Sequence, residues 1–321
     1  YGIGDSEVTS NTFTANVANA EGDGLMQMAP FPFGGGLGLQ RLYRVRVANN
    51  RFEDNVATIG GGGLGGGVGV RAEKGIATTD INIVDNLFLR NLGDGGMIGD
   101  GRGGAISVSQ GQWITVAHNV MIGNSGVLTT DLEPEKASSV IMLSGMMDTS
   151  ARPNYVGLLD VIVDSNQILN SGQGLPAAAG LPNNFAIGVQ ATDRFTITNN
   201  LIAGSTLGGI VAIYEFYGDA IEGYVDTHGE IVNNTIYDNG TYGVWLLNRW
   251  HSGLMTVTNN IIMGHKYGVE GIDLFGRADP VPLDYSVLYD NQEDIGPEAT
   301  ADGSITTTHT IAADPLFFAP A

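Results

Sequence analysis

The sequence predicts an all-β parallel β-helix, a solenoid in which short strands of successive coils stack along one axis. Three observations predict it: a short phrase recurs along the chain, an alternating run precedes most copies, and helical periodicity is nearly absent. In such repeats each coil contacts its neighbours, and paired strands lie about 4.8 Å apart. The 321 residues are therefore expected to form one domain, 1–321, of about nine coils.

The recurring phrase is an Asn, any residue, an apolar residue, two more residues, and then usually Asn, Gly or Ser. Its spacing varies from 26 to 47 residues while the phrase stays constant, so each coil has a fixed corner and variable loops. Asn tolerates the left-handed backbone of a tight corner, and stacked amides satisfy one another's hydrogen bonds. The copies begin at Asn11, Asn50, Asn86, Asn119, Asn166, Asn200, Asn234 and Asn260, with a degenerate copy at Ser286.

The apolar residue of each phrase is expected to stack inside the coil, above and below its counterparts. These residues are Phe13, Phe52, Phe88, Met121, Ile168, Ile202, Ile236, Ile262 and Leu288.

Each coil is predicted to hold three strands. Alternating runs such as VRVANN, INIVDN and FTITNN form the strand before the corner, and the phrase forms the next. A third strand, the face strand, follows: GVGV at 67–70, GAISV at 104–108, FAIGV at 185–189, GIVAI at 209–213 and GVWLL at 243–247. Long loops precede the face strand in the first five coils and follow it at 145–157 and 214–228. We expect these loops to wall a ligand groove along the face strands.

Two segments resemble a known superfamily. IVNNTIYDNGTYGVWL at 231–246 and VTNNIIMGHKYGV at 257–269 resemble the right-handed parallel β-helix repeats of the pectate-lyase-like superfamily. The ending, DYSVLYDN at 284–291 and ADPLF at 313–317, is similar to the last coils of bacterial secreted members. The resemblance implies a single-stranded right-handed parallel β-helix, a secreted or cell-surface location and a polysaccharide partner. It does not choose an activity, because lyases, hydrolases, epimerases, tailspikes and adhesins share this fold.

The charge and composition of the chain exclude several classes of protein function. With 34 acidic and 14 basic residues, net −20, the chain is unsuited to bind nucleic acid or anionic membranes, and it favours Ca²⁺ as a cofactor. Without cysteine it has no disulfide or thiolate site. No apolar run is long enough to span a membrane as a helix. The chain opens within patterned sequence and without a signal peptide, so we expect it to be a fragment of a longer secreted chain.

The candidate site rests on register. Glu215 and Arg249 each lie fifteen residues after a corner Asn, so they are expected to be neighbours in adjacent coils. With His251 they are the predicted catalytic residues. Aromatic, acidic and basic side chains cluster around them, as in sugar sites. The predicted substrate-binding residues are Tyr214, Tyr217, Asp219, Trp250, Asp193, Arg194, Glu270 and Asp273.

Two chemistries fit this cluster. In β-elimination from a uronic acid, Ca²⁺ or Arg neutralises the carboxylate while a base removes the α-proton. In hydrolysis a pair of carboxylates acts as acid and base. A purely structural Glu–Arg surface pair is the alternative, and it contributes little to stability. A metal site is not identified, although loose Ca²⁺ binding in the glycine-rich loop that contains Asp94, Asp100 and Arg102 is left open.

The sequence leaves two functions open. The first is an extracellular polysaccharide-binding and polysaccharide-cleaving protein, lyase- or hydrolase-like, that acts on an acidic glycan. The second is a non-catalytic surface fibre, adhesin or tailspike-like module that associates through its ends or flanks. The absence of polygalacturonase-like and epimerase-like signature motifs and the glycine-rich loops favour the second.

Overall fold

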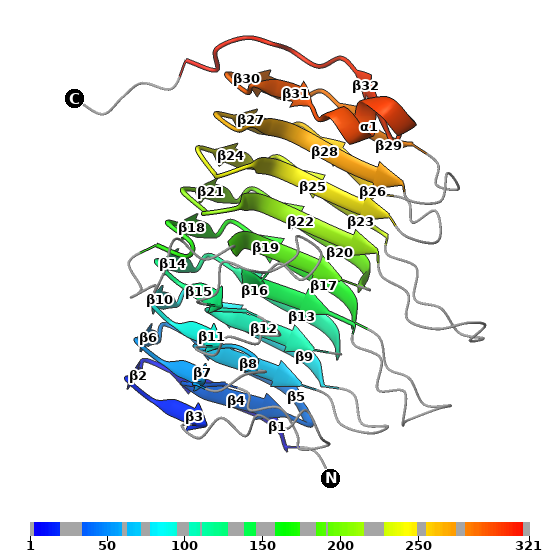
Figure 1. Ribbon diagram of the computed structural model, residues 1–321. Helices are drawn as coiled ribbons and strands as arrows, with labels where there is room; N and C mark the ends of the chain where they lie inside the picture. The colour runs from blue at the N-terminus through cyan, green and yellow to red at the C-terminus, as the bar shows by residue number, and fades with distance from the viewer. Residues whose placement is uncertain are drawn as a thin grey trace.

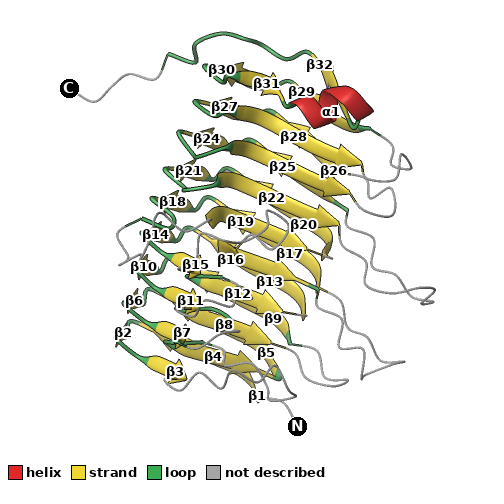
Figure 2. Ribbon diagram, viewed as in Figure 1, coloured by secondary structure: helices red, strands yellow, loops and turns green. Residues whose placement is uncertain are grey.

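The protein forms four parallel β-sheets whose strands stack coil upon coil (Figures 1 and 2). The computed structural model describes residues 3–19, 34–59, 63–71, 78–94, 103–109, 111–127, 138–145, 158–173, 184–190, 192–214, 228–248, 255–273 and 280–316. In Figure 1 the colours from blue to red follow the axis of the stack, so the coils are stacked in chain order.

Sheets 1 and 2 flank the first Asn corner. Sheet 1 contains β1 (Ile3–Thr9), β5 (Leu42–Ala48), β9 (Thr79–Val84), β13 (Gly111–Ala117), β17 (Leu158–Asp164), β20 (Thr192–Thr198), β23 (Gly229–Val232), β26 (Met255–Thr258), β29 (Val281–Asp284) and β32 (Ile305–Thr308). Sheet 2 contains β2 (Thr12–Thr14), β6 (Arg51–Glu53), β10 (Leu87–Leu89), β14 (Val120–Ile122), β18 (Gln167–Leu169), β21 (Leu201–Ala203), β24 (Thr235–Tyr237), β27 (Ile261–Met263) and β30 (Val287–Tyr289).

Sheets 3 and 4 complete the coil. Sheet 3 contains only β3 (Val17–Asn19), β7 (Val56–Thr58), β11 (Leu92–Asp94) and β15 (Ser125–Val127) among the described residues. Sheet 4 contains β4 (Leu37–Gln40), β8 (Val68–Arg71), β12 (Ile106–Ser109), β16 (Ser138–Ser144), β19 (Asn184–Gln190), β22 (Gly208–Tyr214), β25 (Tyr242–Asn248), β28 (Tyr267–Asp273) and β31 (Glu293–Ile295).

The prediction of an all-β parallel β-helix is confirmed. The run before each corner forms sheet 1, the phrase forms sheet 2 and the predicted face strand forms sheet 4. Sheet 3 differs from the prediction of three strands per coil. It arises because the early coils stay extended for three residues after the phrase, whereas in the coil of β21 the chain passes from Ala203 to Gly208 without such a strand.

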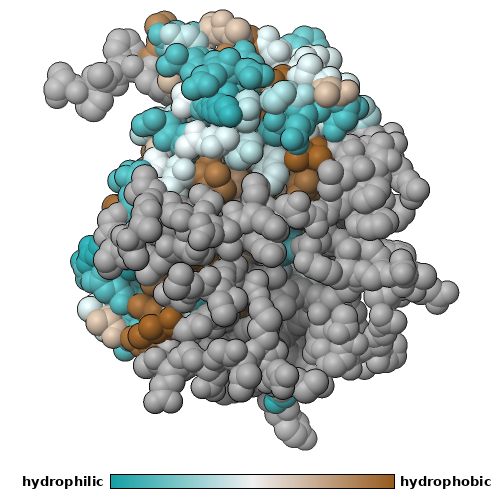
Figure 3. Space-filling view, viewed as in Figure 1, coloured by the Kyte–Doolittle hydropathy of each residue, from teal (hydrophilic) through white to brown (hydrophobic). Residues whose placement is uncertain are grey.

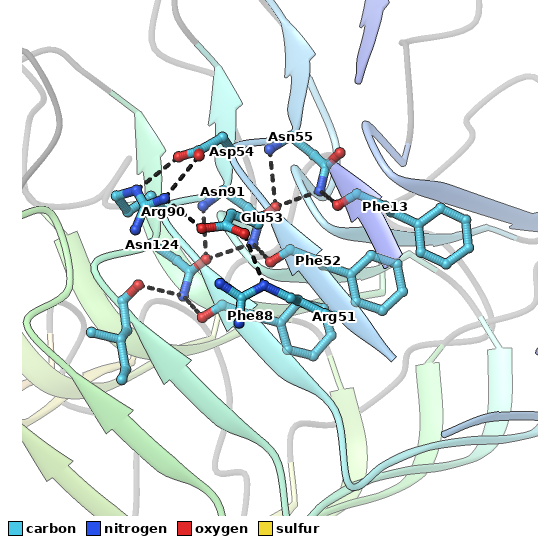
Figure 4. Close-up of polar contacts among 11 residues, drawn as sticks. Phe13, Arg51, Phe52, Glu53, Asp54, Asn55, Phe88, Arg90, Asn91 and Asn124 are labelled. Carbon is cyan, nitrogen blue, oxygen red and sulfur yellow. Dashed lines mark hydrogen bonds and ion pairs between the residues drawn. The ribbon is translucent and has the colours of Figure 1, made fainter. Parts of the chain in front are cut away.

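The corner Asn residues form two ladders rather than one. In the first ladder, Asn166 donates from its backbone N–H and its Nδ2 to Oδ1 of Asn200, at 2.9 and 3.0 Å. The last residue of the phrase forms the second, in which Asn55, Asn91 and Asn124 are linked in the same way (Figure 4). The prediction that the ladder Asn itself takes the left-handed conformation is wrong: the residue before each ladder Asn takes it, as at Asn49 with φ 56°, and the ladder Asn supplies the amide contacts. These amides therefore satisfy buried backbone groups at both corners.

The apolar residues of the phrase stack inside the coil, as predicted. The rings of Phe13 and Phe52 lie 4.8 Å apart and those of Phe52 and Phe88 4.9 Å apart, nearly parallel (Figure 4). Met121 and Ile168 continue the column in paired register. The interior is thus a set of one-residue columns running along the axis, and ring stacking adds to the burial of apolar surface.

One short helix, α1 (Pro297–Asp302), packs against β28 near the end of the stack. It is the only helix among the described residues, and it is too short to cross a membrane. Above the grey atoms in Figure 3, the surface near this end is mainly hydrophilic with a few apolar patches.

Candidate functional site

The outer face of sheet 4 carries the best-defined candidate site in the described part of the chain. The strands of this sheet alternate, so that Val68, Val70, Ile106 and Val108 enter the core while the residues between them face outward. The outward residues of β8 and β12 are Gly69, Arg71, Ser107 and Ser109. On the side of the sheet away from the core, the face strands at this end therefore carry glycine, serine and one arginine, and of these four residues only Arg71 is partly exposed.

The strand register extends this polar surface over five coils. Arg71 pairs with Gln40 on one side and with Ser109 on the other, and Ser109 pairs with Ser144. Ser144 lies level with Gln190, to which its hydroxyl donates at 3.4 Å. We call this set the polar half of the face: Gln40, Arg71, Ser107, Ser109, Ser139, Ser144 and Gln190.

Three atoms of the polar half are buried without a hydrogen-bond partner among the described residues. They are Nη1 of Arg71 and the hydroxyl oxygens of Ser107 and Ser139. Ser107 is 1 % exposed and Ser139 is fully buried. Each unsatisfied buried group costs about 1–3 kcal/mol, so a ligand that supplies acceptors and donors here would recover that free energy. Arg71 is also the only basic residue within the described strands of sheet 4.

The other half of the face is aromatic and aliphatic. The rings of Phe185 and Tyr242 lie 6.2 Å apart, and Trp245 stacks 5.2 Å from Tyr242. Gly208 lies in register between Phe185 and Tyr242, and a Cβ at this position would come within 2.4 Å of the Phe185 ring. Val211, Ile213 and Leu247 pack beside these rings in a second apolar cluster outside the main core. Nε1 of Trp245 has no partner within the described residues, which adds a fourth unsatisfied atom to this face.

Glu270 lies next to Trp245 in register, but it is engaged in the fold. The side chain is 3 % exposed, and its Oε1 accepts hydrogen bonds from the backbone N–H groups of Gly271 at 3.0 Å and Ala299 at 2.9 Å. Burial raises the pKa of this carboxyl group. The contact with Ala299 ties the first turn of α1 to β28, so the structure gives Glu270 a supporting contact in addition to its predicted binding role.

Asp193 and Arg194 lie on β20 in sheet 1 and not on the outer face of sheet 4. The guanidinium group of Arg194 donates to Asp160 in the preceding coil, at 2.6 and 2.9 Å, and to Asp193 at 2.7 Å. His228 in the following coil places Nδ1 2.8 Å from the same Asp193 carboxylate. The Arg194 contact lowers the pKa of Asp160. These residues form a row of polar contacts that links three consecutive coils.

The predicted catalytic residues Glu215, Arg249 and His251 lie outside the described residues, as do Tyr217, Asp219 and Trp250. Tyr214 and Asp273 end described strands, but their side chains are not described. The last described pair of β22 and β25 is Tyr214 with Asn248, one residue before Glu215 and Arg249. The adjacency of Glu215 and Arg249 stays a prediction.

The residues of the polar half were not predicted as site residues, because the predicted site was built around Glu215 and Arg249 in later coils. The signal was present in the alternation of GVGVR and AISVS, which already assigns Arg71 and Ser107 to the outward side of a strand. What alternation does not show is that their polar atoms lack partners.

Comparison with known proteins identifies the type of repeat. Residues 153–282 match the family model described as right handed beta helix region. No curated protein gives a significant match. Together with the parallel sheets, the family match shows that the chain is a right-handed parallel β-helix.

Solved structures match this chain at low sequence identity. A hyperthermoactive exopolygalacturonase from Thermotoga maritima matches with a TM-score of 0.48 and 10 % identity over 85 % of this chain. The chain spans only 54 % of that protein. The A-module of mannuronan C-5 epimerase AlgE6 from Azotobacter vinelandii matches with a TM-score of 0.32 and 14 % identity, over 88 % of this chain and 76 % of that one.

Proposed function

We propose that this chain, a right-handed parallel β-helix repeat protein of the pectate-lyase-like type, is an extracellular protein that binds an acidic polysaccharide along the outer face of sheet 4 and cleaves it. The observation that carries the proposal is the set of buried, unpartnered polar atoms on one face: Arg71 Nη1, Ser107 Oγ, Ser139 Oγ and Trp245 Nε1. A polyhydroxylated polymer with carboxylates supplies partners for all of them.

The two halves of the face suit different parts of a sugar chain. Arg71 is the only basic side chain in the described strands of sheet 4, and it can pair with a uronate carboxylate. A guanidinium–carboxylate contact is strong when it is partly buried. Serine hydroxyls donate to and accept from sugar hydroxyls. The partly exposed Tyr242 and Tyr267 rings offer the flat apolar surface that a pyranose face covers, whereas Trp245 is 3 % exposed and supports Tyr242 from within the row.

For cleavage we propose Glu215, Arg249 and His251, which follow the described strands of the same sheet. In an elimination, Arg249 neutralises the uronate and a base removes the α-proton. In a hydrolysis, Glu215 and a second carboxylate act as acid and base. The product distinguishes the two reactions. Both create a new reducing end, but only elimination leaves an unsaturated sugar at the other new end.

Arg71→Gln is expected to weaken binding of acidic oligosaccharides about tenfold or more, because the variant loses the charged partner of the uronate but keeps a polar side chain. Calorimetry with a panel of uronic-acid oligomers measures this effect. The matched control is Arg46→Gln, an exposed arginine of sheet 1, which should leave affinity unchanged. Equal affinities of the parent and the Arg71 variant would contradict the proposal.

Cleavage is tested separately by Arg249→Ala on the same oligomers. The variant should lose product formation and keep its melting temperature within the small effect of an exposed ion pair. A parent protein that binds the oligomers but never releases product would instead identify a binding module without catalysis.

Millimolar Ca²⁺ or high salt is expected to raise the melting temperature. With a net charge of −20, the acidic side chains repel one another in the folded state, and cations weaken this repulsion by screening it or by binding. Within the described residues no group of three or more His, Asp or Glu side chains is arranged to hold a metal. The proposal of Ca²⁺ as a cofactor therefore rests on the net negative charge alone. Thermal scans in EDTA, CaCl₂ and NaCl distinguish specific binding from screening. Identical midpoints in all three would contradict both.

A further inference from the structure

Sheet 1 carries a column of six left-handed residues on its outer side. Each lies six residues before a ladder Asn, with φ between 51° and 57°. The strands pair on either side of each one: Gln112 with Thr79 and Ile114 with Ile81, so that the residue between them lies level with its counterpart. From the first coil onward the column reads Asp5, Arg44, Asp80, Trp113, Asp160 and Arg194.

The column is organised as Asp–Arg pairs between adjacent coils. Arg44 donates from Nη2 to Asp5 at 2.6 Å. Arg194 donates from Nε and Nη2 to Asp160 at 2.6 and 2.9 Å. In both pairs the arginine of one coil neutralises the aspartate of the coil before it. In these two pairs the column therefore brings side chains of consecutive coils into contact.

The middle pair breaks this pattern. Trp113 occupies the position at which an arginine would neutralise Asp80. The indole is 57 % exposed in the middle of a strand, and a left-handed conformation is unfavourable for a residue of this size. Within the described residues Asp80 has no ion-pair partner, and its one hydrogen bond comes from the Asn82 amide at 3.5 Å. An unpaired carboxylate thus lies level with an exposed indole.

We infer that Asp80 and Trp113 form a binding site for a protonated amino sugar. Its ammonium group takes the position of the missing guanidinium, bonded to the Asp80 carboxylate and against the Trp113 ring, where cation–π attraction is strongest among the aromatic residues. The flat indole face accepts the pyranose ring that carries the amine. The net charge of −20 raises the local concentration of such a cation. This site lies on sheet 1, apart from the proposed acidic-glycan site on sheet 4.

The test is calorimetric titration of the whole chain with β-1,4-linked glucosamine tetramer at mildly acidic pH, where the amines are protonated. We expect Trp113→Arg to weaken binding about tenfold, since it removes the ring and supplies Asp80 with the partner that Asp5 and Asp160 already have. Asp80→Asn should weaken binding by a similar factor. Asp5→Asn is the matched control, because that carboxylate is already paired, and its affinity should stay within about twofold of the parent.

Three results would overturn the inference. The first is unchanged affinity of Trp113→Arg, whose fold is checked by its melting temperature. The second is equal binding of the fully N-acetylated tetramer, which shows that the charge is not recognised. The third is equally tight binding of a lysine tetrapeptide, which shows that the sugar ring is not recognised. None of these bears on the sheet 4 proposal, because Arg71 and its neighbours are unchanged in every variant.

Discussion

Replacing Asn200 by Leu should lower the free energy of unfolding by about 2–4 kcal/mol. Asn200 is 1 % exposed and donates from Nδ2 to the carbonyls of Val163 and Thr198, both at 2.9 Å, and to Oδ1 of Asn234 at 3.0 Å. Its own Oδ1 accepts two hydrogen bonds from Asn166. A leucine leaves these buried groups unpaired on both sides, so the loss extends over three coils.

The ladder offers its own control for this variant. Asn11 is the first member, is exposed, and donates to Asn50 as Asn200 donates to Asn234. Because water replaces the lost partners there, Asn11→Leu should cost much less. Urea unfolding of both variants gives the comparison. Equal losses would show that the cost comes from the shape of leucine at a tight corner and not from burial of the ladder.

Acidification should destabilise the protein through His265, and His265→Asn should remove that part of the effect. His265 stands in the second ladder where most other coils have Asn and two have Ser, and it is 3 % exposed. Burial lowers its pKa from 6.5 to about 4, against a smaller opposing contribution from the hydrogen bond to Asn291. Its Nε2 accepts from Asn239 at 3.2 Å and its Nδ1 donates to Asn291 at 3.1 Å, so only the neutral ring with the proton on Nδ1 satisfies both partners.

The direction of this pH dependence follows from the lowered pKa of His265 in the folded state. Since the unfolded chain takes up the proton near pH 6.5 and the folded chain only near pH 4, stability is complete above about 6.5 and falls as the pH decreases toward 4. The full difference is about 3 kcal/mol. Thermal melts across this window should show a shallower decline for His265→Asn than for the parent. His118→Asn, at an exposed corner residue, is the control and should follow the parent. Parallel pH profiles for the parent and His265→Asn would contradict the assignment.

The fold was predictable because its signals are local. A corner Asn, an apolar residue two places later and an alternating run determine the backbone and the inward side of each coil without long-range information. Sheet 3 was not predictable in this way, because three extended residues beside a loop resemble the loop itself. The second ladder was visible in the phrase, but the sequence does not show that His265 takes the position of an amide.

The candidate site was less predictable because it depends on which groups lack partners. The outward direction of Arg71 and Ser107 follows from alternation, but their missing hydrogen bonds are a property of the packed sheet. The pair of Asp80 and Trp113 is intermediate. Counting back from each ladder Asn aligns the column, yet the meaning of Trp113 emerges only when the Arg44–Asp5 contact is known.

The ladders also bear on how such a chain can change in length. Every internal Asn of the first ladder offers the same two donors to the coil after it and the same acceptor to the coil before it, whether the intervening segment has 47 residues, as between Asn119 and Asn166, or 26, as between Asn234 and Asn260. Each internal coil therefore makes the same Asn contacts with the coil before it and with the coil after it, whatever its length. Duplication of the 26-residue coil, or growth of a loop in any coil, leaves both neighbours with the contacts they already have. Selection can thus alter the binding surface and the number of coils independently.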